Sequence, residues 1–497
     1  MTGDPRALLA RLHAAAVQGA APFACTRDAV QAWCARHQVD TGARVHLIAL
    51  GKAAPAMARG TLAACNTIGA EVVALTVVCA QPPASIDWGA AHLPVQRQIV
   101  EGDHPVPGPA SLQAAETIAD AVSAVAPGDV VIVLISGGTT ALCAAPVPEL
   151  SQLVGSAERA QAHVANLAQT LLESGLAIHE MNAIRRRVLR FGGGRLAVAL
   201  ARRGARRIGT FAVSDVIGDD PAVIGSGPCS PDPLTPDGLL ALIDAHGMRA
   251  HLERAVATTL GVEGAGPALV PPTADDPAFR YVDFELVARN AQAVRAMADA
   301  AQAAGITSVQ VSTTPLEGEA TALGELLVQQ ALQAAATGAF AGAPMLWCAG
   351  GEPVVHLRET VARALALDEA ADAQEPEHMD VVLGRYTAAD EPMRGGRMQV
   401  LALSAALALE AAAHRGDPWA HRITVLAAGT DGRDGPTDAA GAITDAAVPA
   451  LARRGRRTPE QDLVTGRSWY ALDVADALLR TGPTGTNVMD VVGLLLH

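Results

Sequence analysis

The chain has 497 residues, half of them apolar, which exceeds one ordinary domain and predicts two. A formal net charge of −14 argues against nucleic acid as the main partner, although it does not exclude an anionic small molecule, because local charge decides that. The scattered cysteines without a CxxC pair, the lack of a long apolar run and the lack of a secretory signal predict a cytoplasmic protein that enters no membrane.

Short apolar runs that end in glycine or a polar loop alternate with Ala- and Leu-rich helical stretches. The runs expected to be strands are 45–50, 72–78, 129–135, 207–214, 282–288, 308–313, 345–350 and 423–429. Continuous apolar strands separated by helices predict mostly parallel sheets covered by helices on both faces, a Rossmann-like α/β architecture. In such folds ligands bind beyond the carboxyl ends of the strands.

The domain organisation is suggested by the loop-like segments. The Pro-, Asp- and Gly-rich stretch 215–237 predicts a boundary near residue 240. We therefore expect an N-terminal α/β domain at 1–240 and a C-terminal α/β domain at 241–497, with an acidic insert near 359–393.

Lys52 is the only lysine, since the other members of the 37 basic residues are all arginines. It lies in the segment LGKAAP (50–55), directly after the first predicted strand. The segment is not a Walker A loop, because no glycine stands five positions before Gly51 and Ala53 follows the lysine. A compact ammonium group at this end of a strand can hold a phosphate or carboxylate, and the alternative is a solvated surface lysine.

A second candidate anion-binding segment follows the predicted strand 129–135. Ser136, Gly137, Gly138 and Thr139 form a turn whose backbone N–H groups can point toward an anion at the start of a helix. The alternative is an ordinary tight turn between strand and helix.

Clustered arginines form a third candidate site. In the segment NAIRRR (182–187), Asn182, Arg185 and Arg186 can clamp a substrate carboxylate or phosphate, or lie on a solvated helix face. The segment GGGRLA (192–197) then matches a variant of the dinucleotide fingerprint. The charged residues before it are unlike the buried strand that this motif requires, so we discount it.

Carboxylates gather after the predicted strand 207–214. Asp215, Asp219 and Asp220 lie within six positions, where carboxylates beside phosphates usually hold Mg²⁺, or where one can act as a base on a substrate hydroxyl. N-capping and turn formation are the alternative roles. We expect Asp219, Asp220 and Glu352 to be metal ligands.

Glycine and hydroxyl residues are dense in the C-terminal half. The residues expected to bind nucleotide or phosphate there are Gly350, Gly351, Gly429, Thr430, Asp431, Thr484 and Thr486. Arg397 follows two glycines and begins a long Ala- and Leu-rich helix, a position that suits stabilisation of a transferring phosphoryl group. Ordinary turns and an exposed loop arginine are the alternatives.

Taken together and in this order, the segments resemble the glycerate 2-kinase family, whose C-terminal half is often called the MOFRL domain. The most specific pieces are SDVIGDDPAVIGSGP, GTDGRDGPTDAAGAITD and TGPTGTNVMD. The resemblance implies two α/β domains with the active site in the cleft between them. It implies ATP- and Mg²⁺-dependent phosphorylation of the 2-hydroxyl of D-glycerate, giving 2-phosphoglycerate. It also assigns catalytic roles to Lys52, Asp215 and Arg397.

Several motif positions differ from the usual family pattern, which leaves two other hypotheses open. Thr139 replaces a glycine, and Met398 and Val400 alter the motif that contains Arg397. A homologue that binds a nucleotide or sugar acid without turnover is therefore one alternative, and an NAD(P)H-dependent hydroxypyruvate reductase is the other. ATP and a small hydroxy acid are the expected partners; the oligomeric state stays open, a homo-oligomer included.

Overall fold

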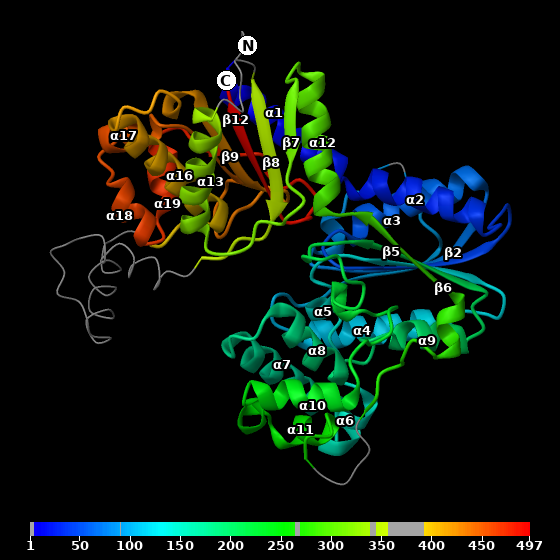
Figure 1. The fold of residues 1–497 in the computed structure, drawn as a ribbon. Helices are drawn as coiled ribbons and strands as arrows, with labels where there is room; N and C mark the ends of the chain where they lie inside the picture. Colours follow the sequence, from blue (N-terminus) through cyan, green and yellow to red (C-terminus); the bar gives the residue numbers. More distant parts are fainter. Residues whose placement is uncertain (1–3, 90, 264–268, 338–343, 356–391) are drawn as a thin grey trace. The chain divides into compact units, whose positions relative to one another are not determined.

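The computed structural model describes residues 4–89, 91–263, 269–337, 344–355 and 392–497 (Figure 1). The chain forms two compact units. We call residues 21–289 the N-terminal unit, and residues 1–20 with 290–497 the C-terminal unit. The chain thus passes between units after Ala20 and after Arg289, whereas the expected boundary near residue 240 falls inside helix α10 (Pro236–Ala245). The expected insert near 359–393 lies almost wholly outside the described residues.

The N-terminal unit is built on a six-stranded, fully parallel sheet in the order β3-β2-β1-β4-β5-β6. Its strands are β1 (Arg44–Leu50), β2 (Glu71–Cys79), β3 (Gln96–Glu101), β4 (Val130–Ile135), β5 (Arg207–Val213) and β6 (Val282–Ala288). The central strand β4 is buried along its whole length, as expected for the apolar run VVIVLI in a sheet covered on both faces. This order is that of the Rossmann fold, so the expectation for this unit is confirmed.

Helices cover both faces of this sheet (Figure 1). Helices α2 (Pro22–Arg36) and α3 (Ala54–Ile68) lie on one face, and α4 (Pro109–Ser123), α5 (Thr139–Leu142) and α9 (Arg195–Arg202) lie on the other. A further helical layer has its own apolar core. It contains α6 (Pro148–Val154), α7 (Ala157–Glu173), α8 (Ile178–Val188), α10 and α11 (Arg254–Thr259).

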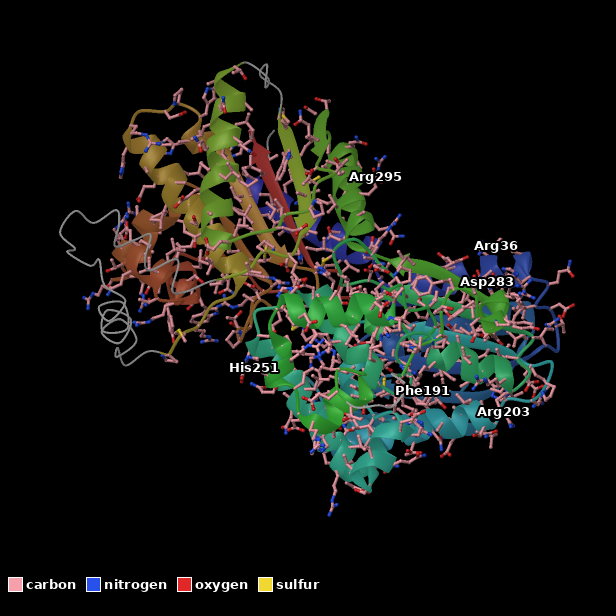
Figure 2. The ribbon with its side chains drawn as sticks, turned by 60° about the horizontal axis from the view of Figure 1, so that its bottom comes forward. Arg36, Phe191, Arg203, His251, Asp283 and Arg295 are labelled. Carbon is pink, nitrogen blue, oxygen red and sulfur yellow. The ribbon has the colours of Figure 1, made fainter. Side chains whose placement is uncertain are left out.

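Strand β6 belongs to the N-terminal unit because it completes the parallel sheet beside β5. Trp33 of α2 packs edge-on against Phe211 of β5 and donates a hydrogen bond to Asp283 of β6 (3.2 Å). Figure 2 shows Asp283 near Arg36, which forms an ion pair with Glu285. These contacts bind α2 to β5 and to the edge strand β6, so the unit extends well past residue 240.

The C-terminal unit contains a mixed sheet in the order β11-β10-β9-β12-β8-β7. Its strands are β7 (Ser308–Val311), β8 (Met345–Gly351), β9 (Ile423–Gly429), β10 (Gly441–Thr444), β11 (Leu478–Leu479) and β12 (Asp490–Leu496). Only β7 and β8 run parallel, while β12 is antiparallel to both of its neighbours. The chain is α/β as predicted, but a mostly parallel sheet was wrong for this unit, because the unpredicted strands β10 and β12 each run antiparallel to both of their neighbours.

Helices cover the mixed sheet on both faces as well (Figure 1). Helices α1 (Pro5–Gly19) and α12 (Asn290–Ala303) lie on one face, and α13 (Ala320–Ala336) and α16 (Arg397–His414) lie on the other. Three short helices complete the unit: α17 (Val448–Arg454), α18 (Pro459–Val464) and α19 (Ser468–Val474). In the described part of the chain, no helix is long and apolar enough to cross a membrane.

All eight predicted strands are present, and the described residues contain four further strands that the sequence did not predict, β3, β10, β11 and β12. The predicted runs are continuous and apolar. Strand β3 (QRQIVE), in contrast, is mostly polar, and β11 has only two residues. Strand β12 is apolar but follows the turn residues of TGPTGTNVMD so closely that its start was not recognised.

Candidate active site

The N-terminal unit has a topological switch point between β1 and β4, where the strand order reverses. In open parallel sheets ligands bind at such a point, beyond the carboxyl ends of the two strands. Lys52 follows β1 and Ser136 follows β4. The Lys52 N–H donates to the carbonyl of Gly137 (2.9 Å), and the Ala53 N–H donates to Ser136 Oγ (3.0 Å). The two predicted anion-binding loops are therefore joined at the place where a ligand is expected.

The side chain of Lys52 is exposed and lies beside Gly138. A Cβ atom added to Gly138 would lie 3.3 Å from Lys52 Cγ and 3.2 Å from His104 Cδ2. Burial, assisted by the positive charge of Lys52, lowers the pKa of His104 from its usual value. Sequence reasoning did not select His104; its only signal was the HPVP segment after β3.

Asp215 follows β5 and approaches the same loop. A Cβ atom on Gly137 would lie 1.9 Å from Asp215 Oδ2, so this position accepts only glycine while the carboxylate stays in place. The structure thus brings together Lys52, Gly137, Gly138 and Asp215, four residues that the sequence analysis proposed for the site. Thr139 differs, because its buried hydroxyl donates to the Ser136 carbonyl (2.7 Å) and closes the turn.

The arginines of the predicted clamp differ in whether they already pair with a carboxylate. Arg186 and Arg187 are buried and share the carboxylate of Asp232, at 3.0 and 2.7 Å. Arg186 also donates to the Ala222 carbonyl (2.9 Å), so it joins segments of the fold. Arg185 donates to Asn182 Oδ1, has no ion pair with any described carboxylate, and has its pKa lowered to about 10 by burial. Arg185 is therefore the better candidate for an anionic ligand.

The predicted metal-binding carboxylates of the N-terminal unit already have partners. Asp220 Oδ1 accepts a hydrogen bond from the Ala222 N–H (2.9 Å), which forms a local turn. Asp219 has a left-handed backbone (φ 55°) and lies 3.8 Å from Arg289. Within the residues that the structure describes, no three of His, Cys, Asp and Glu gather as a metal-binding group.

Arg397 is the centre of the polar site in the C-terminal unit. Its Nε lies 2.6 Å from Asp490 Oδ2 and its Nη1 lies 2.9 Å from Glu352 Oε1. Burial alone would lower the pKa of Arg397, but the two carboxylates hold it above its usual value. Asp490 begins β12 opposite the last residues of β8 and β9, so the group lies at the carboxyl ends of those strands. Burial raises the pKa of Asp490 to about 6.

Asp434 holds the start of α16, on which Arg397 lies. Its carboxylate accepts the N–H groups of Met398 (3.2 Å) and Gln399 (2.8 Å), two donors without partners inside the helix. Burial raises the pKa of Asp434 to about 7. Neither Asp434 nor Asp490 was selected from the sequence, although both lie in motifs that supported the resemblance.

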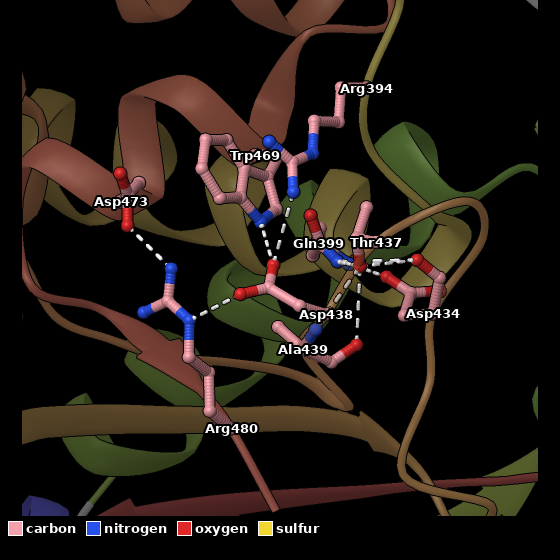
Figure 3. A network of polar contacts seen from close by, with 9 residues as sticks. All are labelled: Arg394, Gln399, Asp434, Thr437, Asp438, Ala439, Trp469, Asp473 and Arg480. Carbon is pink, nitrogen blue, oxygen red and sulfur yellow. Dashed lines mark hydrogen bonds and ion pairs between the residues drawn. The ribbon is translucent and has the colours of Figure 1, made fainter. Parts of the chain in front are cut away.

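A neighbouring network fixes the segment just before Arg397 (Figure 3). The guanidinium of Arg394 stacks 3.6 Å over the ring of Trp469, and the indole N–H of Trp469 donates to Asp438 (2.8 Å). Arg480 donates to the other oxygen of Asp438 (2.9 Å). These contacts connect the approach to α16 with the loop after β9.

The two hydroxyl-rich loops, residues 429–438 and 481–487, are bonded to each other and to the start of β12. The Thr430 hydroxyl donates to the Met489 carbonyl (2.7 Å), and the Thr484 hydroxyl donates to the Thr430 carbonyl (2.6 Å). The Thr486 hydroxyl donates to the Ala20 carbonyl. The three hydroxyls predicted to bind phosphate therefore hold the loops in shape.

The glycines that were predicted to bind nucleotide in this unit are required at their positions for different reasons. A Cβ on Gly350 would lie 1.7 Å from Asn290 Oδ1, and one on Gly351 would lie 2.3 Å from the Leu316 carbonyl oxygen, so both glycines serve packing. A Cβ on Gly429 would lie 3.1 Å from Asp431 Oδ1 and 3.3 Å from Asp490 Oδ1. Asp431 and Asp490 therefore face one small space beside Gly429.

The fingerprint-like segment 192–197 follows helix α8. A dinucleotide fingerprint has to follow a buried strand, because its glycines let the pyrophosphate approach the start of the next helix. Segment 192–197 therefore lacks the preceding strand that a dinucleotide-binding motif requires.

Comparisons with known proteins match both the N-terminal and the C-terminal parts of the chain. Residues 8–261 match the family described as Domain of unknown function (DUF4147), and residues 381–490 match the MOFRL family. A protein of Agrobacterium vitis named as a hydroxypyruvate reductase is 32% identical, over 91% of this chain and 99% of its own length. The D-glycerate 2-kinase of Thermotoga maritima is 29% identical, over 91% of both chains. The crystal structure of the glycerate kinase from the same organism has a TM-score of 0.73 at 26% identity and covers 99% of both chains.

Proposed function

Because the chain belongs to the glycerate 2-kinase family with DUF4147 and MOFRL regions, we propose that it transfers the γ-phosphoryl group of ATP to the 2-hydroxyl of D-glycerate. The observation that carries the proposal is the junction of the Lys52 and Ser136–Gly138 loops at the switch point between β1 and β4. A cation beside glycine-rich backbone at this edge suits a phosphate group.

Charge balance and positioning supply most of the catalysis in phosphoryl transfer. In the proposal, the ammonium of Lys52 neutralises charge on the transferring phosphoryl group. Asp215, which contacts the glycine turn, orients the substrate hydroxyl or accepts its proton. Arg185, oriented by Asn182, binds the substrate carboxylate.

Arg397 contributes a second positive charge in the proposal. Its guanidinium is held by Glu352 and Asp490 at the start of α16, so its orientation is set before a ligand arrives. A pre-oriented guanidinium stabilises developing charge without reorganising in the transition state.

The family implies Mg²⁺, which usually takes one or two protein carboxylates together with phosphate oxygens. Asp431 and Asp490 fit this pattern, because their oxygens face the same small space beside Gly429. They form a second pair of candidate ligands beside the predicted Asp219 and Asp220, since Asp431 accepts the Arg433 N–H (3.0 Å) just as Asp220 accepts the Ala222 N–H. The bound ion would neutralise negative charge on the phosphates.

The test is the release of ADP from Mg-ATP with D-glycerate, comparing the wild type with Lys52→Ala and Lys52→Arg. We expect glycerate-dependent turnover that falls by about 10²–10³-fold in Lys52→Ala. It should also fall in Lys52→Arg, because a planar fork does not replace a compact ammonium group. Arg59→Ala, a basic residue of α3 outside this site, is the control and should keep wild-type turnover. Wild-type turnover in Lys52→Ala would contradict the role of Lys52.

The name of the Agrobacterium vitis relative supports a second candidate, reduction of hydroxypyruvate with NAD(P)H. The Rossmann strand order is compatible with it, but the turn after β1 lacks the dinucleotide fingerprint. Loss of NAD(P)H absorbance with hydroxypyruvate would support the reductase. A flat trace from protein that phosphorylates glycerate would exclude it. Binding of ATP without any turnover would instead indicate the non-catalytic homologue.

A further inference from the structure

Helix α1 is the first helix of the chain, yet it packs in the C-terminal unit against α12, beside β9 and β12. One side of α1 is buried and mostly apolar, and Leu8, Leu9, Leu12 and Ala16 lie in it. His13 lies in the same buried surface with only 1% of its area exposed. A histidine in that surface requires an explanation, because a leucine would pack there without a polar group to satisfy.

The contact of His13 supplies that explanation. Its Nε2 lies 3.0 Å from the carbonyl oxygen of Gly429, the last residue of β9. A carbonyl oxygen can only accept, so Nε2 carries the proton and donates it. Burial lowers the pKa of His13, which favours the neutral ring with a single N–H. The bond therefore fixes both the tautomer of the histidine and the direction of the Gly429 carbonyl.

The far end of α1 contacts the other hydroxyl-rich loop. The carbonyl of Ala20, seven residues after His13, accepts the hydroxyl of Thr486. Thr430 and Thr484 already bond the two loops to each other, through the 2.6 Å contact between the Thr484 hydroxyl and the Thr430 carbonyl. Two turns of one helix thus touch both loops, more than 400 residues away in the chain.

We propose that His13 is a positioning residue, which sets the turn Gly429–Asp431 through the Gly429 carbonyl and so places Asp431 beside Asp490. The inference rests on the proposed function in one respect, which is the assignment of this turn to the metal–nucleotide complex. It assigns to the N-terminal helix a part in the site that the motifs did not indicate. Loss of the bond should free the turn while leaving Lys52 and the N-terminal unit unchanged.

The experiment compares His13→Leu, which keeps the volume but removes the donor, with His13→Gln, whose amide N–H can reach a similar point. We expect His13→Leu to raise the KM for Mg-ATP by about tenfold and to require more Mg²⁺, with the KM for D-glycerate little changed. His13→Gln should recover most of the loss. Leu12→Ala is the matched control, since it destabilises the same helix without touching Gly429, and it should lower Tm but leave the KM for Mg-ATP unchanged.

Hydrogen exchange separates this inference from the proposed function. The amides of residues 429–434 should lose protection in His13→Leu and keep it in His13→Gln, whether or not glycerate is the substrate. Wild-type protection and wild-type KM in His13→Leu would overturn the positioning role. Equal rises in KM for Mg-ATP in Leu12→Ala and His13→Leu would also overturn it. They would show that the rise comes from destabilisation of α1 and not from loss of the hydrogen bond to Gly429. A wild type without kinase turnover, but with the expected exchange pattern, would reject the kinase proposal alone.

Discussion

Arginine and carboxylate groups meet in both units, but in opposite proportions and environments. In the N-terminal unit two arginines, Arg186 and Arg187, share one carboxylate, Asp232, and all three side chains are at most 4% exposed. In the C-terminal unit one arginine, Arg397, lies between Asp490 and Glu352, and the side chains of Arg397 and Glu352 are 32% and 40% exposed.

This difference distinguishes arginines that stabilise the fold from an arginine that can bind a ligand. Arg186 and Arg187 are buried and paired with Asp232, so they are not accessible to a ligand. Their contacts connect α8 to the loop after β5. A partly exposed guanidinium at the carboxyl ends of strands can still approach a ligand. From the sequence, Arg186 was expected to bind the substrate and Arg397 to stabilise the transferring phosphoryl group, and neither Asp232 nor Asp490 was selected as a partner.

The largest loss of activity is expected from substitution of Arg397, in the partly exposed group of the C-terminal unit. Arg397→Ala should lower kcat for glycerate phosphorylation by about 10³-fold, because it removes a charge that would act on the transferring phosphoryl group. Arg397→Lys should recover part of the loss, since it keeps the charge but not the two-pronged contact with Glu352 and Asp490. Steady-state kinetics with purified, folded variants measure this. An unchanged kcat in Arg397→Ala would place Arg397 with the structural arginines.

Substitution of Asp232, in the buried group of the N-terminal unit, should instead lower the stability of the fold. Asp232→Asn leaves two buried guanidiniums without their carboxylate, and such losses cost about 3–5 kcal/mol of unfolding free energy. Urea unfolding measures the change, while the KM values of the folded fraction should stay near those of the wild type. Asp244→Asn, which breaks an exposed pair with Arg249, is the control and should leave the midpoint unchanged. A large rise in KM for D-glycerate in Asp232→Asn, without destabilisation, would contradict the structural role.

The smallest expected effect is on the pH dependence of stability, through Asp434, whose carboxylate caps α16. Burial raises the pKa of Asp434 to about 7, so the folded state holds a proton that the unfolded chain releases at lower pH. A raised folded pKa contributes stability that is present at acid pH and is lost as the pH rises toward 7. The unfolding free energy of the wild type, relative to Asp434→Asn, should therefore decrease between pH 5 and pH 8. Urea titrations at several pH values measure the difference, and a flat or rising curve would show that Asp434 is ionised throughout.

The α/β class, eight of the strands and the loops that carry Lys52, Gly137 and Asp215 could be predicted from the sequence. These features are local, because a buried parallel strand needs an unbroken apolar run and a tight turn after it needs glycine. The single lysine among arginines was also visible in the sequence, and the structure places it at the switch point that strand order alone defines.

Which polar residues lie together became visible only in the folded chain. The antiparallel entry of β12 brings Asp490 to the ends of β8 and β9, and hence to Arg397, which is 93 residues earlier. His13 reaches Gly429 across 416 residues because α1 packs in the C-terminal unit. Arg185 and Arg186 are neighbours in sequence, yet only Arg186 meets a carboxylate among the described residues. Such pairings depend on burial and on partners far along the chain, which neither periodicity nor local motif encodes.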